Sequence, residues 1–90
     1  MKSLKFAFIQ SGYCVFGVGY TEEQAISDAR KWLEGENGVQ GGLSWRETRA
    51  LLSDDRDSGF ALICSHDDEF DSYLKNQGGF VKRGKGWYRH

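Results

Sequence analysis

The densest group of reactive side chains lies in "CSHDDEFD", residues 64–71, where an apolar strand is expected to run into the start of a helix. The start of a helix gathers backbone N–H groups and positive potential, which can bind anions or lower a thiol pKa. One hypothesis is therefore an enzyme or ligand-binding site with Cys64 as nucleophile, Ser65 beside it and His66 as base. In the alternative, Ser65 caps the helix and Cys64 belongs to the core. We favour this alternative because His66 has already left the strand and does not project beside Cys64.

Metal chemistry finds little support in the sequence. The acidic residues that suggest a hard cation are Asp55, Asp57, Asp67, Asp68 and Glu69. The stretch "DDRDSG" lacks the alternating oxygen ligands and the later bidentate Glu of a calcium loop, so it reads as a turn. Cys14 and Cys64 stand inside apolar runs, which predicts reduced, buried thiols. The sequence predicts no catalytic residue, no metal and no cofactor.

The segment "FVKRGKGWYRH", residues 80–90, carries four basic residues and no acid. Its basic side chains suit phosphate contacts and its aromatic rings suit stacking on unpaired bases. The candidate binding residues are Lys82, Arg83, Lys85, Trp87, Tyr88 and Arg89. In the alternative the segment is the end of a sheet, whose basic residues discourage pairing with other sheets. We expect a structural role first and a contact surface second.

The elements that position these groups follow from periodicity and capping signals. Strands are expected at 4–9, 13–18 and 60–64. Helices are expected at 22–34, at 45–52, and from Ser65 until Gly78 ends the third. The last segment is either a hairpin with Gly84 and Lys85 as its turn or one long bent strand. The sequence thus predicts one α+β domain, 1–90, with a mostly antiparallel sheet, helices mainly on one face, and the order β-β-α-α-β-α-β(β).

The first two strands predict apolar side chains on both faces of the sheet. With Ser11 and Gly12 as loop residues, Ile9 is opposite Cys14 and Phe8 is opposite Val15. One face then holds Leu4, Phe6, Phe8 and Val15, and the other holds Ala7, Ile9, Cys14, Phe16 and Val18. A helix layer, with Trp32 and Leu33 buried against the sheet, covers one face. The second apolar face also needs a cover. We expect either a second copy of the chain in a homodimer, or residues 35–52 with Trp45 packed against this face.

Composition narrows the class of protein. The apolar fraction is 39%, the charged fraction 28% and the formal net charge −1, as in a globular protein without the overall basic charge of many nucleic-acid binders. The opening apolar stretch is too short and too polar for a secretory signal, and no apolar run is long enough to span a membrane. We therefore expect a cytoplasmic protein.

The stretch "FGVGYTEEQAISDARKWLEG", residues 16–35, locally resembles two known patterns. It is similar to the passage from strand to helix in HicB-type antitoxins, and also to the end of double-stranded RNA binding domains. The RNA-binding pattern places lysines at the helix start, where this chain has Glu22, Glu23 and Gln24. The rest of the chain follows neither pattern, so the sequence assigns no family.

Three functions remain open from the sequence. The first is a non-enzymatic binding or regulatory protein that acts on a macromolecular partner, from a bacterium or a mobile element. The second is a nucleic-acid-binding protein that uses the basic C-terminal segment. The third is a small enzyme or ligand-binding protein that uses the junction at Cys64, Ser65 and His66.

Overall fold

Three strands form an antiparallel sheet in the order β2-β1-β3, and the last two strands form a separate antiparallel hairpin. The elements along the chain are β1 (Phe6–Gln10), β2 (Cys14–Gly19), α1 (Glu22–Gly35), α2 (Trp45–Ala50), a 3₁₀ turn η1 (Leu51–Ser53), β3 (Phe60–Cys64), α3 (Asp68–Gln77), β4 (Phe80–Arg83) and β5 (Gly86–Arg89). The predicted α+β class and the order of elements are confirmed.

The computed structural model describes residues 3–12, 14–35, 44–53 and 59–90, and within 33–35 it describes only the backbone. Several expectations lie outside the described residues: the connection at 36–43, the turn at 54–58 with Asp55 and Asp57, and the burial of Leu33.

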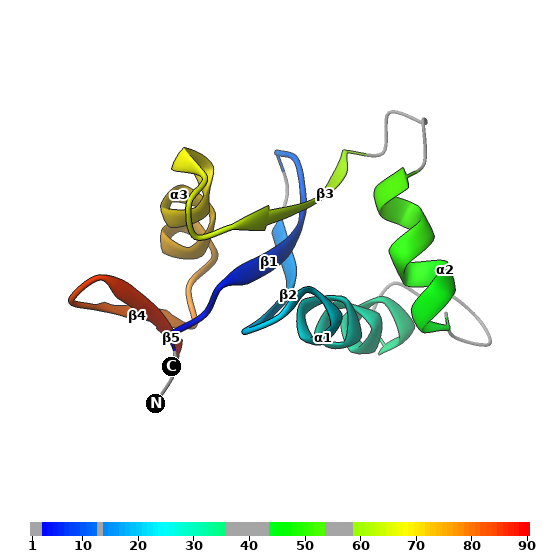
Figure 1. Cartoon of the computed structure of the whole chain (residues 1–90), viewed down its shortest axis with the longest axis horizontal. Coiled ribbons are helices and arrows are strands. Elements are labelled where there is room, and N and C mark those ends of the chain that lie inside the picture. Colours follow the sequence, from blue (N-terminus) through cyan, green and yellow to red (C-terminus); the bar gives the residue numbers. More distant parts are fainter. Residues whose placement is uncertain (1–2, 13, 36–43, 54–58) are drawn as a thin grey trace.

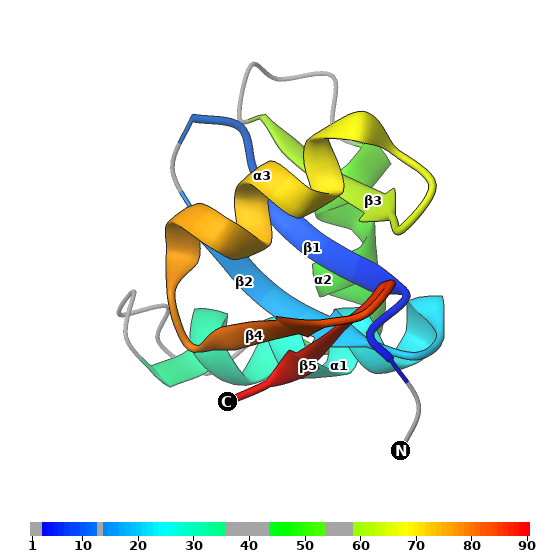
Figure 2. The ribbon, with the colours of Figure 1, turned by 90° about the vertical axis from the view of Figure 1, so that its left-hand side faces the viewer.

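The sheet lies between two layers (Figure 1). Helices α1 and α2 cover one face, where Phe8, Ile26 and Ala29 are buried and Trp45 packs against them. Helix α3 and the β4–β5 hairpin cover the other face, as Figure 2 shows from the side of the hairpin. The argument for a homodimer from an uncovered sheet face is therefore wrong. Trp45 packs on the face that α1 also covers, so the alternative in which Trp45 plugs the second face is wrong as well. Association of two copies stays a prediction.

The predicted register between β1 and β2 is wrong. Gln10 is opposite Cys14 and Ile9 is opposite Val15, but Phe8 is opposite Gly17, so Phe16 is an extra residue on β2. Such a bulge returns the side chains that follow it to the other face. Val15 therefore joins the cluster beneath α3 and the hairpin, whereas Phe16 joins the cluster beneath α1 and α2.

Trp32 is another correction, because half of its surface is exposed (50%) instead of buried against the sheet. Helix α1 approaches β2 very closely: a Cβ at Gly17 would lie 2.2 Å from the backbone nitrogen of Ala29. Only small side chains fit where helix and strand meet, and Ala25 and Ala29 are fully buried there. The large indole of Trp32 lies one turn further along α1, at the margin of this contact.

Candidate functional site

The C-terminal segment is a hairpin, the first of the two forms that the sequence left open. Lys82 is opposite Trp87 and Val81 is opposite Tyr88, which confirms the register inferred with Gly84 and Lys85 as the turn. Gly84 has a φ of 60°, a conformation that glycine adopts without strain. Since side chains alternate along each strand and opposite residues share a side, the hairpin has an inner face and an outer face.

The inner face holds the hairpin to the rest of the protein. Trp87 is buried, and its indole nitrogen donates a hydrogen bond to Oδ1 of Asp71 on α3 at 2.6 Å. Lys82 forms an ion pair with the other oxygen of Asp71 at 2.9 Å. Arg89 binds Asp28 on α1 at 2.5 Å, and the same carboxylate accepts a bond from the Val18 N–H. Three of the six predicted binding residues therefore have structural partners.

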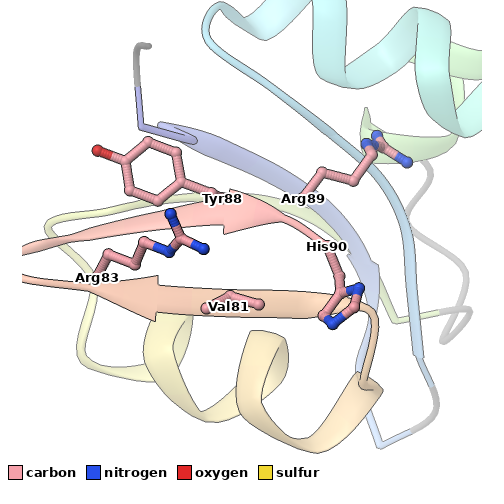
Figure 3. Close-up of a pocket in the computed structure, with 5 residues that line it drawn as sticks. All are labelled: Val81, Arg83, Tyr88, Arg89 and His90. Atoms are coloured by element: carbon pink, nitrogen blue, oxygen red, sulfur yellow. The ribbon is translucent and has the colours of Figure 1, made fainter.

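The outer face carries the remaining chemistry. Val81, Arg83, Tyr88 and His90, with Arg89 at the margin, line an open cavity of about 370 Å³. Figure 3 shows Arg83 and Tyr88 side by side on this surface, with His90 beyond Val81 and Arg89 pointing away toward α1. No acidic residue is among the described side chains that line it. We call Val81, Arg83, Tyr88 and His90 the outer hairpin face.

The sequence named only part of this surface. Arg83 and Tyr88 were predicted and lie together, and Lys85 is exposed at the adjacent turn. Val81 and His90 were missed, although strand alternation from Tyr88 places both on its side of the hairpin. The alternation of side chains along the two strands therefore tells which hairpin residues lie on the outer face and which on the inner face. The overall charge of the segment does not.

The junction at Cys64 differs from the sequence prediction. Helix α3 begins at Asp68, with Asp67 rather than Ser65 at the N-cap. Asp67 accepts a hydrogen bond from the Cys64 N–H at 3.0 Å, which closes a turn before the helix. Ser65 and His66 are exposed, and Cys64 is partly buried. Within the part of the chain that the structure describes, no hydrogen bond joins Cys64 to His66.

The thiols and the acids offer little further chemistry. Cys14 and Cys64 are both only partly buried, so the prediction of buried thiols is wrong in degree. Burial nevertheless raises the pKa of the Cys14 thiol. Among the described side chains, no three His, Cys, Asp or Glu residues gather in a metal-binding arrangement. The helices in the described ranges are too short or too polar to cross a lipid bilayer.

Comparison with known proteins gives no relative from which a role could be carried over. No family model, no curated protein and no solved structure matches the chain. The outer hairpin face therefore has to be interpreted from its own chemistry.

Proposed function

We propose that the protein is a non-enzymatic binding module that holds single-stranded nucleic acid on the outer hairpin face. The observation that carries this proposal is the open cavity in which the Tyr88 ring lies beside the Arg83 guanidinium with no described acid lining it. Single-strand binders combine aromatic rings, on which bases stack, with cations that follow the backbone. A cavity of about 370 Å³ is large enough to receive a base.

The arrangement of charge supports the same partner. The chain as a whole has a net charge of −1, but four basic residues fall within 80–90 and none of the acids does. Asp71 and Asp28 neutralise Lys82 and Arg89 on the inner side, which leaves Arg83 and Lys85 for solvent and ligand. The outer hairpin face is thus a small positively charged surface that attracts phosphate groups. We expect it to bind nucleic acid with moderate affinity that depends strongly on salt.

Binding is tested by fluorescence anisotropy with a labelled single-stranded DNA of about ten nucleotides, a length that covers one small binding site. We expect the affinity to fall steeply between about 50 and 200 mM salt, because phosphate contacts release counterions. A duplex of the same sequence should bind more weakly, since its bases are not free to stack on Tyr88.

Two neighbouring lysine and arginine positions supply a matched pair of variants. Arg83→Gln removes a cation from the outer hairpin face and should lower the salt slope by about one. Lys82→Gln removes a cation one residue away on the inner face, and should leave the salt slope unchanged. Tyr88→Ala should weaken binding by about 1–3 kcal/mol, the usual loss for one stacked base. Equal effects of the two cation variants, or no binding at about 50 mM salt, would refute the proposal.

A further inference from the structure

The two outer edges of the β2-β1-β3 sheet are finished differently. On the β2 side, the N–H groups of Val15 and Val18 donate to Gln77 Oε1 at 3.1 Å and to Asp28 Oδ2 at 3.0 Å. Just beyond the strand, the Tyr20 N–H donates to Gln24 Oε1 at 3.0 Å. These acceptors come from α1 and α3, so side chains occupy donors that another strand would need.

The β3 side has fewer such bonds. Ser65 donates its N–H to the carbonyl of Lys5, and Ser11 donates to the carbonyl of Gly59. These two bonds show that the backbone groups of residues 59 and 65 point toward β1. Because the direction alternates along a strand, those of residues 61 and 63 also point toward β1, and those of residues 60, 62 and 64 point away from it. The Cys64 N–H is taken by Asp67.

Phe60 and Leu62 supply the other outward backbone groups of this edge. No residue in the described ranges accepts a hydrogen bond from their outward N–H groups, and both side chains are only partly buried. The whole strand, "FALIC", contains no charged residue and no proline. Soluble proteins usually protect an edge strand with lysines, prolines, bulges or a covering element. An uncharged apolar edge fits a strand of the same kind, and the small net charge of −1 sets up little repulsion between copies.

We infer that a second copy of this chain pairs its β3 antiparallel to the first across this edge. Because Cys64 is already bonded, the usable groups are those of Phe60 and Leu62. The register that uses both sets Phe60 opposite Leu62 of the partner subunit, around a two-fold axis at Ala61. The two three-stranded sheets then form one continuous sheet.

The side chains suit this register. The Phe60 ring packs against Phe8 and Phe16, with ring centroids 5.7 Å apart in both pairs. Leu62 packs against the same cluster. Pairing therefore continues an existing apolar cluster across the axis. The contact is short compared with interfaces of permanent dimers, so the dimer should be weak and reversible.

Disulfide trapping tests the register directly. Residues opposite each other at a non-hydrogen-bonded position have Cα atoms about 4.5 Å apart, within the range of a disulfide. We would place Ala61→Cys in a chain that also carries Cys14→Ser and Cys64→Ser, and oxidise it with oxidised glutathione. Covalent dimer should accumulate, whereas Lys75→Cys in the same background, on the exposed side of α3, should stay mostly monomeric. Equal yields from the two variants would overturn the inference.

Association without a crosslink is measured by sedimentation velocity over a range of concentrations. We expect the mass to rise from 10.2 kDa toward twice that value. Ala61→Lys places two like charges opposite each other and should abolish dimers, whereas Ala61→Gln, of similar length and uncharged, should keep them. Circular dichroism checks that both variants are folded. A parent chain that stays at 10.2 kDa up to millimolar concentration would also overturn the inference.

Discussion

Trp87 donates its indole N–H to the Asp71 carboxylate across 2.6 Å, and this bond ties the C-terminal hairpin to α3. Lys82 donates to the second oxygen of the same carboxylate. The hydrogen bonds from Lys82 and Trp87 hold the pKa of Asp71 below its ordinary value of 3.8. The exposed carboxylate of Asp71 thus accepts hydrogen bonds from both the buried Trp87 and the charged Lys82 of the hairpin.

The lowered pKa of Asp71 predicts a loss of stability in acid. Since the folded pKa lies below the unfolded one, the unfolded chain takes up the proton first as the pH falls through 3.8. The contribution of Asp71 is complete above this range and is lost toward the lower folded pKa. In Asp71→Asn, the free energy of unfolding from urea titration should therefore be below that of the parent at about pH 6, and the gap should be narrower at about pH 3. A gap of equal size at both pH values would contradict this assignment.

Burial predicts unequal costs at two large apolar positions. Leu74 on α3 is fully buried, so Leu74→Ala should lower the free energy of unfolding by about 2–5 kcal/mol. Trp32 is half exposed, so Trp32→Ala should cost much less even though it removes more atoms. Urea titration of both variants measures the two losses. The reverse order would mean that Trp32 is part of the core.

The close approach of α1 to β2 predicts that a single methyl group is not tolerated at Gly17. Its Cβ would lie 2.5 Å from the carbonyl oxygen of Ala25 and 2.2 Å from the backbone nitrogen of Ala29, both of which are backbone atoms of α1. Overpacking of this kind costs about 1–3 kcal/mol or more, and we expect Gly17→Ala at the upper end. Gly78→Ala is the control for backbone strain, because φ is 76° at Gly78 and no atom lies within 4 Å of the added Cβ. A smaller loss at Gly17 than at Gly78 would refute the close approach.

Partial burial predicts slow chemistry at Cys14. Because burial raises the pKa of this thiol above 9.0, less thiolate is present at neutral pH than in an unfolded chain. In a Cys64→Ser variant, modification of Cys14 by a thiol reagent should be slower in the folded protein than in urea, and should accelerate as the pH rises. Equal rates in both states would show that the thiol is fully accessible.

Local signals in the sequence predict most of the elements but not how they meet. Thr21 and Gln24 mark the start of α1, and their bonds are present: the Gln24 N–H donates to Thr21 Oγ1 and the Tyr20 N–H donates to Gln24 Oε1. Ser44 and Glu47 form the expected capping box of α2. These signals act over three or four residues, which is why they can be recognised without the fold.

The errors arise where distant residues decide the outcome. The bulge at Phe16 changes the register of β2, and no short-range pattern announces it. The carboxylate of Asp67 reaches back to the Cys64 N–H, so α3 starts later than Ser65 suggests. The division of the basic C-terminal residues into structural and exposed ones depends on Asp71 and Asp28, which lie on two different helices.

The side-chain bonds on β2 also bear on how this protein would aggregate. Gln77 and Asp28 cover donors of the strand only while α3 and α1 are docked on the sheet. If α3 detaches in a local opening, the Val15 N–H loses its acceptor and an apolar strand edge is exposed. Loss of one helix would then create a template for intermolecular β-structure while the sheet itself is still intact. The docking of α3 therefore also protects the chain from aggregation through this strand edge.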